Sequence, residues 1–402
     1  MRWKFKRKMK NMIVLCDSIS CTGCGACVNR CPISCIRMVP DAEGFLRPEI
    51  DQVRCIGCGQ CHKVCPVLES PAKHSKPEMC YAAWARDNRI RQKSSSGGIF
   101  SVLAEEILRR GGHVAGAAFD ENMELRHILI TEPEQLVKLQ GSKYIQSNPD
   151  MIYREVEMRL KQNIPVLFTG TPCQVAALLT FLGREYAGLY TCELICHGVP
   201  SPGFFRRYLQ RVEDCDLNTI RDFQFRDLNG WGYRLCMISE TGYEKPLKGK
   251  RNDFLSLFLG GVTMREACYR CSYASPERVA DITLGDFWGI QYSHKPEHFT
   301  RGISFVALNS FQGQELFHTI NDQIVCERRT FEEAANHNQQ LIKPTRRPAA
   351  RNQFYGDYCR LPYREFRKKY GLYRPLYQRI CSAVKRRIIL LKCWLRSDQQ
   401  NI

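Results

Sequence analysis

The chain has 402 residues, of which 44% are hydrophobic, enough for two or three domains with real cores. Its 22 cysteines far exceed ordinary usage, but a chain of this length does not need a disulfide scaffold. A net charge of +18 would suggest nucleic-acid binding if it were spread over the fold. It is instead concentrated at the two ends of the chain, which argues against a basic groove across the fold.

The first residues carry charge but no targeting pattern. Residues 1–10 contain six Lys or Arg and no acid, and no apolar segment with a small-residue cleavage site follows. No run of about 18 apolar residues exists anywhere, so we expect no membrane-spanning helix. Residues 1–16 are therefore interpreted as a basic N-terminal extension of a cytoplasmic protein, whose cysteines serve as metal ligands or redox groups.

An internal repeat follows this extension. "CTGCGACVNRCP" (21–32) recurs as "CIGCGQCHKVCP" (55–66), with the cysteines, glycines and proline in register. Residues 17–68 resemble the two-cluster bacterial ferredoxins, which implies an α+β ferredoxin-like 2[4Fe-4S] domain that conducts electrons. Zinc knuckles also use C-x2-C pairs, but two complete runs ending in Cys-Pro disfavour them. The predicted ligands are Cys21, Cys24, Cys27 and Cys65 for cluster 1, and Cys55, Cys58, Cys61 and Cys31 for cluster 2.

A polar linker, residues 69–78, leads to a region with a different residue pattern. Apolar runs typical of strands alternate there with helical patterns, which predicts an α/β domain over residues 79–342. A helix with a Ser/Gly entry and a glycine exit is expected at 94–112, and a later helix at 311–320. The predicted strands are 113–119, 165–170, 189–196, 220–225, 280–287 and 303–308.

One cysteine in this domain stands at a predicted helix start. In "FTGTPCQ" (168–174), Thr171 fits the N-cap, Pro172 the first helical position and Gln174 the third, which is a capping box. Cys173 would then lie where free amides and the helix dipole stabilise a thiolate.

Other cysteines can reach Cys173. The pair Cys268 and Cys271 has ligand spacing, but two ligands leave any metal half satisfied. Cys192 and Cys196 belong to the strand that follows Cys173. Because the carboxyl ends of neighbouring parallel strands line one crevice, Cys173 and Cys196 could face each other with the Cys268–Cys271 loop over them. The alternatives are a lone reactive Cys173 or a set of inert buried thiols.

Six ordered motifs resemble the beta-subunit family of coenzyme F-420-reducing hydrogenase and formate dehydrogenase. They are "SSGGIFSVLAEEIL", "GSKYIQS", "FTGTPCQVAAL", "LICHGVPSP", "CYRCSY" and "ADITLGDFWG". The resemblance implies an iron–sulfur flavoprotein with FAD beside a further [4Fe-4S] cluster, passing electrons between one-electron carriers and a hydride acceptor. The family's cluster cysteines fall on Cys173, Cys196, Cys268 and Cys271, with Cys192 as the substitute.

The flavin site is indicated less directly. The "SSGG" entry offers small residues and free amides that suit a diphosphate, although any helix start in a packed domain has them. The resemblance adds Ser142 and Lys143 of "GSKYIQS", although a lone lysine is more often a solvated surface group. The predicted flavin residues are Ser96, Gly97, Gly98, Ser142 and Lys143. No G-x-G-x-x-G follows a strand and no G-x4-G-K-[ST] occurs, so no Rossmann nicotinamide site or triphosphatase is indicated.

Two further side chains are ambiguous, and no catalytic residue is predicted. His197 beside Cys196 could donate a proton near a flavin, although a hydrogen-bonded structural histidine is the commoner case. Asp286 in "GDFWG" could orient a ligand or cap a turn.

The last segment, residues 343–402, is basic and aromatic. Residues 343–396 hold sixteen Lys or Arg against Asp357 and Glu365, and a mostly helical tail is expected. Its last helix would place apolar side chains near one face, namely those of Ile380, Val384, Ile388, Leu391 and Leu395. That pattern predicts contact with an anionic membrane or an acidic partner, with a solvated extension as the alternative. Its tyrosines make RNA binding a weaker third possibility.

The leading hypothesis is a cytoplasmic iron–sulfur flavoprotein oxidoreductase. Two ferredoxin clusters, a third [4Fe-4S] cluster and FAD would pass electrons to coenzyme F-420 or an analogous acceptor. A redox protein or a soluble hydride carrier would be the partner. The alternative is a non-catalytic electron-transfer adaptor without flavin. It would serve a partner enzyme, such as one of surface-polysaccharide biosynthesis, beside which bacterial relatives occur.

Overall fold

The computed structural model describes residues 13–213, 219–226, 235–239, 241–247, 253–291 and 302–372. The chain forms two compact units, Met1–Ala349 and Ala350–Ile402. The first unit begins with a small domain that carries the cysteine repeat and has two short helices and a two-stranded antiparallel sheet. These elements are α1 (Ala26–Arg30), β1 (Ile36–Pro40), β2 (Leu46–Ile50) and α2 (Gln60–Lys63).

Glycines make the two halves of the repeat adopt the same turns. Gly23 and Gly25 have φ angles of 70° and 74°, and the equivalent Gly57 and Gly59 have φ angles of 71° and 70°. Residues with a Cβ rarely adopt this left-handed conformation, so the glycines let the chain fold back between successive cysteines. Gly25 and Gly59 are also the N-caps of α1 and α2, so each half starts its helix at the same point of the motif.

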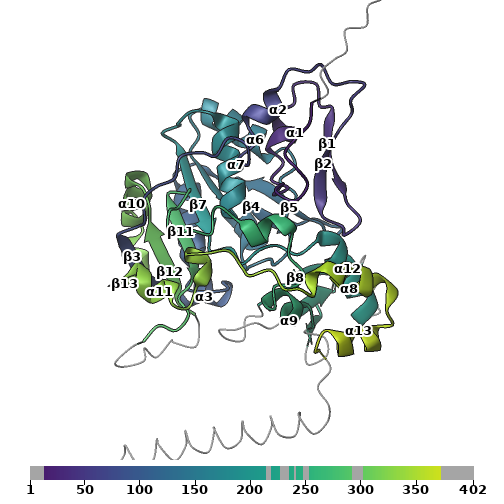
Figure 1. The fold of residues 1–402 in the computed structure, drawn as a ribbon. Helices are drawn as coiled ribbons and strands as arrows, with labels where there is room; N and C mark the ends of the chain where they lie inside the picture. Colours follow the sequence, from purple (N-terminus) through teal and green to yellow (C-terminus); the bar gives the residue numbers. More distant parts are fainter. Residues whose placement is uncertain are drawn as a thin grey trace, which may run out of the picture. The chain divides into compact units, whose positions relative to one another are not determined.

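An eight-stranded mixed sheet forms the centre of the first unit (Figure 1). Its middle strands are parallel to one another, and antiparallel strands extend it at both edges. In spatial order the strands are β13 (Ile324–Arg329), β3 (Met79–Ala85), β12 (Ser304–Leu308), β11 (Ile282–Asp286), β7 (Leu189–Leu194), β6 (Val166–Gly170), β4 (His113–Phe119) and β5 (Leu125–Ile130).

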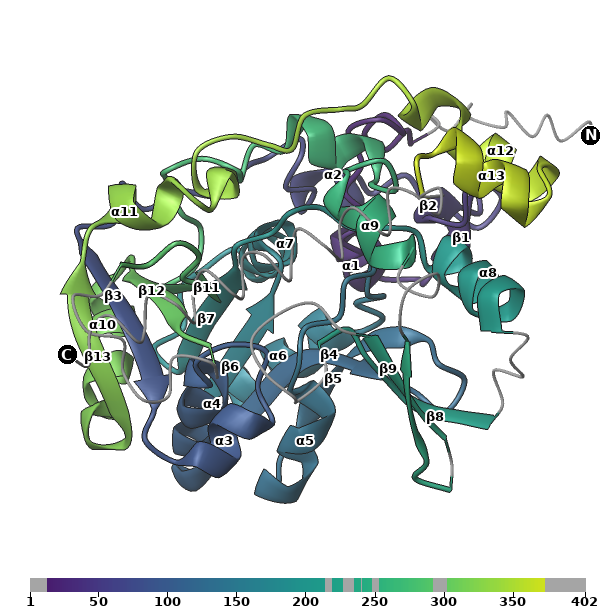
Figure 2. The same cartoon turned by 90° about the horizontal axis from the view of Figure 1, so that it is seen from below.

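Helices cover both faces of this sheet, as Figure 2 shows from below. One face packs against α4 (Ile99–Arg109) and α10 (Phe311–His318), and the other against α6 (Ile152–Lys161) and α7 (Pro172–Leu182). Strand β6 is buried along its whole length because side chains alternate between the two cores: Leu167 enters the first, and Phe168 the second. Shorter helices are α3 (Asn88–Gln92), α5 (Leu136–Leu139) and α11 (Phe331–Ala335).

The core around α7 also contains residues of the ferredoxin-like domain. Cys24, Ala26 and Val64 lie in the same buried cluster as Phe168 and Phe181. Tyr153 in α6 donates its hydroxyl to the carbonyl of Cys24 at 2.7 Å. The two parts therefore share one hydrophobic core.

The chain also contains a smaller sheet in the first unit and two helices in the second unit. The first unit also contains a three-stranded antiparallel sheet and two helices: β8 (Ile220–Gln224), β9 (Leu235–Ser239), β10 (Glu244–Leu247), α8 (Pro202–Glu213) and α9 (Asp253–Leu259). The second unit contains α12 (Arg351–Arg360) and α13 (Tyr363–Lys369). The predicted linker 69–78 is hydrogen-bonded to the main body, since His74 pairs with Arg278.

The predicted tail is only partly described. Residues 343–349 belong to the first unit, and the second unit begins at Ala350. Within the second unit, Phe354, Tyr358, Phe366 and Tyr370 pack ring against ring, and Tyr358 is only 2% exposed. Tyr358 is therefore a core residue and cannot serve as a stacking platform for RNA bases. The predicted amphipathic helix at 376–396 lies outside the described residues. Among the described helices, none has the length and hydropathy of a membrane span.

Candidate cofactor site

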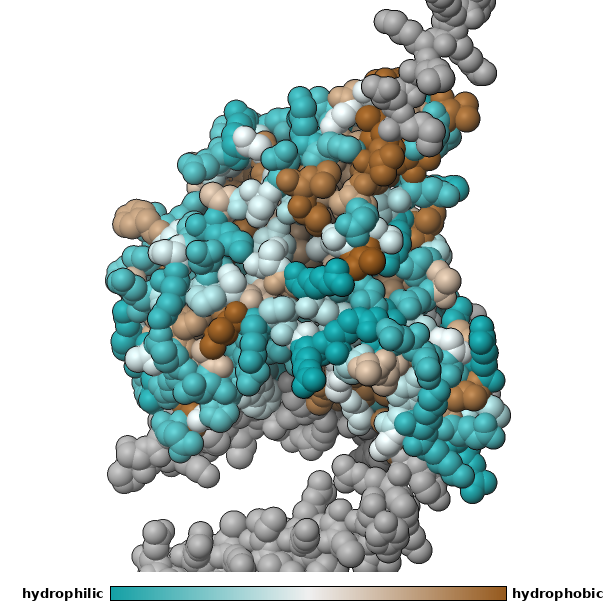
Figure 3. Space-filling model, in the orientation of Figure 1, coloured by the Kyte–Doolittle hydropathy of each residue, from teal (hydrophilic) through white to brown (hydrophobic). Residues whose placement is uncertain are grey.

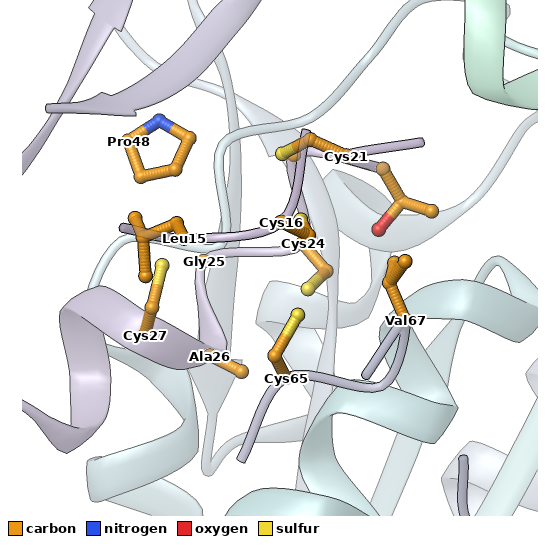
Figure 4. A pocket seen from close by; sticks show the side chains of 12 residues that line it. Leu15, Cys16, Cys21, Cys24, Gly25, Ala26, Cys27, Pro48, Cys65 and Val67 are labelled. Carbon is orange, nitrogen blue, oxygen red and sulfur yellow. The ribbon is translucent and has the colours of Figure 1, made fainter. Parts of the chain in front are cut away.

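The four cysteines predicted for cluster 1 line one hollow of about 340 Å³, here called hollow 1 (Figure 4). Three come from the first run and Cys65 comes from the second, as the ferredoxin pattern requires. The sulfurs of Cys24 and Cys65 point toward one another in Figure 4. Backbone N–H groups of Gly23, Ala26 and Val28 act to lower the pKa values of Cys21, Cys24 and Cys27, respectively. Cys16, which the motif does not include, lies in the same hollow.

The four cysteines predicted for cluster 2 line a second hollow of about 320 Å³, here called hollow 2. It also contains an extra thiol, because the sulfur of Cys35 lies 3.4 Å from the sulfur of Cys31. Among the described residues, no three His, Cys, Asp or Glu side chains converge tightly enough to hold a single metal ion. The four predicted thiols of each hollow match in number the ligands of a four-iron cube.

Apolar side chains are exposed on the domain that carries these hollows. Figure 3 shows them as brown surface over this domain, at the top of the view. Val53 is 92% exposed, Val14 69% and Ile56 54%. Cys58, one of the thiols of hollow 2, is exposed as well. Hollow 2 therefore lies beside an exposed apolar surface.

Cys173, Cys196, Cys268 and Cys271, here called the third cysteine set, come together at the carboxyl edge of the sheet. Cys173 starts α7 just after β6, and Cys196 follows the neighbouring parallel strand β7. Cys268 and Cys271 lie at a short 3-10 helix between α9 and β11. The four thiols are close enough for charge on one to affect the pKa of the others.

Backbone pairing holds two of these loops together. Arg265 donates its backbone N–H to the carbonyl of Val199 at 3.0 Å, and Pro200 forms a bridge with Met264. Gly198 has a φ of 123°, and a Cβ there would meet the Met264 sulfur at 2.5 Å and the Cys268 Cβ at 3.3 Å. A glycine is therefore needed for the loop after β7 to approach the loop of Cys268.

The capping box that starts α7 is confirmed, but its expected effect on Cys173 is not. Thr171 is the N-cap, and its backbone N–H donates to Gln174 Oε1 at 3.0 Å. Burial nevertheless raises the pKa of the Cys173 thiol to about 12, although a hydrogen bond from Thr171 opposes this. Burial outweighs the helix start at this thiol. The helix start alone therefore does not keep Cys173 ionised near neutral pH.

Cys192 does not belong to the third cysteine set. It is fully buried within β7, in the core on the α4 face of the sheet. Cys173 packs against the core on the other face. The interpretation of Cys192 as a substitute ligand is therefore wrong, because its side chain lies in the core on the opposite face of the sheet from Cys173.

The two stretches predicted to bind flavin meet in space. The backbone N–H of Ser142 donates to Ser95 Oγ at 2.7 Å, which joins "SSGG" to "GSKY". Ser96 Oγ already donates to the carbonyl of Ile303, and the Gly97 N–H donates to Ser304 Oγ. These two groups therefore serve the fold, whereas Gly98 is the left-handed N-cap of α4.

Lys143 and the two ambiguous side chains have defined surroundings. Lys143 donates to the carbonyls of Lys138 and Gln140, and burial lowers its pKa to about 8. Asp286 forms an ion pair with the buried Arg226. The His197 ring lies edge-on to Phe258, with 5.4 Å between ring centroids, and burial lowers its pKa.

Family models match most of this architecture. The model described as the C terminus of the coenzyme F420 hydrogenase/dehydrogenase beta subunit matches residues 165–334, and the model of the N terminus matches residues 80–150. A 4Fe-4S dicluster domain matches residues 20–68. The chain belongs to the coenzyme F420 hydrogenase/dehydrogenase beta-subunit family.

Other comparisons are less extensive. No curated protein matches the chain. Among solved structures, the chain is similar to a chain in a xenon-derivatised F420-reducing [NiFe] hydrogenase complex from Methanosarcina barkeri. The identity is 19% and the TM-score 0.47, over 67% of this chain and 90% of that one. Membership of the beta-subunit family, together with the dicluster domain, assigns the chain to iron–sulfur oxidoreductases that transfer electrons.

Several residues that lie beside the predicted cluster cysteines are not apparent from the sequence. Cys16 and Cys35 lie outside the repeated spacing, so the repeat gave no reason to place them in the hollows. Arg265 and Gln146, which contact the loop of Cys21, are distant from it along the chain. Only the position of Arg265 three residues before a C-x2-C pair could have drawn attention to it.

A buried histidine supports the start of α7 and predicts a pH effect. His127 lies 3.1 Å from Ser147 Oγ, which accepts a hydrogen bond from Gln174 of the capping box. Burial lowers the pKa of His127 to about 4, from 6.5 for the ordinary side chain. The unfolded chain therefore binds the proton first, and stability falls as the pH drops from 6.5 toward 4, by up to about 1.4 kcal/mol per pH unit.

Urea unfolding under anaerobic conditions at pH 7.5 and 5.5 measures this effect. The wild type is expected to lose about 1.4 kcal/mol more than a His127→Gln variant between these two pH values. Equal losses in both proteins would contradict the role given to His127.

Proposed function

We propose that the chain is an iron–sulfur flavoprotein oxidoreductase that links [4Fe-4S] clusters to FAD, which exchanges hydride with coenzyme F-420 or an analogous acceptor. One observation carries the proposal: hollow 1 and the third cysteine set share a hydrophobic core. Cys24 is buried in that core, Cys173 and Cys271 pack against it, and charge on Cys173 affects the pKa of Cys24. Closely spaced carriers without water between them suit electron transfer.

The donor sets fit cubes in number and chemistry. Cys21, Cys24, Cys27 and Cys65 would hold the first cube and Cys55, Cys58, Cys61 and Cys31 the second, with Cys173, Cys196, Cys268 and Cys271 holding the third. Backbone N–H groups of Gly198, Val199 and Tyr273 act to lower the pKa values of Cys196, Cys268 and Cys271, and amides stabilise the sulfur ligands of iron–sulfur clusters in the same way. A bound four-iron cube exchanges single electrons, and a bound flavin can exchange a hydride with an organic acceptor.

The positions of the hollows favour one order of carriers. Hollow 2 lies beside the exposed apolar side chains of Val53 and Ile56, where a redox partner protein could dock. Hollow 1 packs against the α7 core and the third cysteine set. Electrons would thus enter or leave at hollow 2 and cross hollow 1 to reach the third set.

The flavin is assigned to the carboxyl edge of the sheet. Ser96, Gly97, Gly98, Ser142 and Lys143 would border it, and the contact between Ser142 and Ser95 supports a joint site. Strand β3 is parallel to β6 and β7, so the start of α4 lies at the same edge as Cys173 and Cys196. Lys143 would hold an anionic group of the cofactor, since it is the cation of this set.

The test is to purify the protein anaerobically, extract flavin, and mix the dithionite-reduced protein with oxidised coenzyme F-420. About one FAD per chain and bleaching of the F-420 absorbance are expected. If FAD is present but the F-420 absorbance does not bleach, the protein is a flavoprotein and coenzyme F-420 is excluded as its acceptor. Absence of flavin would overturn the proposal in favour of an electron-transfer adaptor.

A further inference from the structure

A buried arginine connects the loop of Cys268 to hollow 1. Arg265 lies three residues before Cys268 and is only 1% exposed. Its Nε donates to the carbonyl of Cys21 at 2.6 Å, and Nη1 donates to the carbonyl of Leu46 at 2.9 Å and to Gln146 Oε1 at 3.1 Å. Its Nη2 lies 3.7 Å from the sulfur of Cys21. One guanidinium thus reaches a predicted cluster ligand of the other domain.

This cation has no carboxylate partner among the described residues. Its hydrogen-bond acceptors are two carbonyls, one amide oxygen and one sulfur. Arg278 is equally buried but pairs with the carboxylate of Glu193. Burying a charge is costly unless an opposite charge compensates it. The negative charge that compensates Arg265 must therefore come from another group.

Cluster-bound thiolates at the two cysteine sites would supply such a charge. Arg265 contacts Cys21 in hollow 1, and its charge also acts on Cys173 and Cys268 in the third cysteine set. We propose that Arg265 is the shared counter-cation of the cubes in hollow 1 and in the third cysteine set, and that it raises the reduction potential of both. The part concerning the third set rests on the function proposed above.

The physical reason lies in the charge of each state. Four thiolates make a ligated cube an anion, and its reduction adds one electron and breaks no bond. A cation fixed beside it therefore stabilises the reduced form more than the oxidised form, most strongly where water is excluded. The chain leaves room for this cation, since a Cβ at Gly23 would collide with Arg265 and Gln146.

The experiment is a redox titration of the anaerobically purified full chain, followed by electron paramagnetic resonance. In Arg265→Gln, the ratio of reduced to oxidised cube in hollow 1 at a fixed potential is expected to fall about tenfold, a shift of about 59 mV for one electron. The cube of the third set shifts in the same direction. The cube of hollow 2 keeps its potential and serves as the internal reference.

Two further variants separate charge from packing. Arg265→Lys keeps the positive charge but lacks the planar guanidinium group. Its reduction potential for the cube in hollow 1 should therefore be closer to that of the wild type than the potential in Arg265→Gln. Gln146→Glu places the missing carboxylate beside Arg265 with almost no change of shape, and should lower the potential of hollow 1 with Arg265 still present. This variant also preserves the test if Arg265→Gln fails to assemble its clusters.

Arg154→Gln is the matched control. Arg154 also crosses between the domains, but it donates to backbone carbonyls of Asn29 and Cys31. Its removal should leave the potential of hollow 1 unchanged. Equal shifts of all cubes in Arg265→Gln, or no shift in Gln146→Glu, would overturn the proposal. If the wild-type chain holds only two cubes, the third cluster is refuted. The reduction potential of the cube in hollow 1 would then still test the role of Arg265.

Discussion

Replacing Cys173 with serine is expected to remove one cube, so that the iron content falls by about four atoms per chain. The ferredoxin-type pair should remain, because neither hollow 1 nor hollow 2 uses this thiol. Three thiols would be left in the third cysteine set, and a buried serine hydroxyl is a much weaker ligand for iron than a thiolate. Iron analysis and electron paramagnetic resonance of anaerobically purified protein measure the change.

Cys192→Ser is the matched control for this experiment. Cys192 is fully buried, whereas Cys173 is partly buried, and it lies on the neighbouring strand β7 in the core on the opposite face of the sheet. Its replacement should leave the iron content unchanged. An unchanged iron content in Cys173→Ser, or an equal loss in both variants, would contradict the assignment of the third cysteine set.

Arg278→Met is expected to lower the free energy of unfolding by about 3–5 kcal/mol, because it leaves the Glu193 carboxylate buried without its partner. Neither side chain is more than 1% exposed. Glu193 also accepts a hydrogen bond from Thr283, which is too little to compensate a buried charge. Urea unfolding followed by circular dichroism measures the loss.

The double variant Arg278→Met with Glu193→Leu tests the reason for this loss. It should recover most of the stability, because an apolar pair can replace a buried ion pair at little cost. Arg278 also donates to the carbonyls of Tyr273 and Ser275, just after Cys271. The double variant should therefore still hold iron less firmly at the third cysteine set. A double variant no more stable than Arg278→Met would contradict the ion-pair explanation.

Local patterns predicted those parts of the fold that local chemistry determines. The cysteine repeat predicted which thiols line each hollow, because three of the four lie in one short run and the glycines permit only a few turns there. The apolar runs at β4, β6 and β12 predicted strands, as observed. The Thr171–Gln174 capping box predicted the start of α7 to the residue.

The features that the sequence did not predict depend on contacts between residues that are far apart along the chain. Strands β3 and β13 pair across more than two hundred residues, and neither carries a pattern that reveals its partner. Cys192 was misjudged because the sequence shows that strand residues alternate but not which face each one takes. Arg265 was missed because its role depends on Cys21 and Gln146, which only the folded chain brings near it.

The most direct test of the three-cube arrangement is the iron and acid-labile sulfide content of the wild-type chain purified without oxygen. Three cubes predict about twelve atoms of each per chain. About eight of each would leave only the ferredoxin-type pair, and would contradict the assignment of Cys173, Cys196, Cys268 and Cys271 to a cluster.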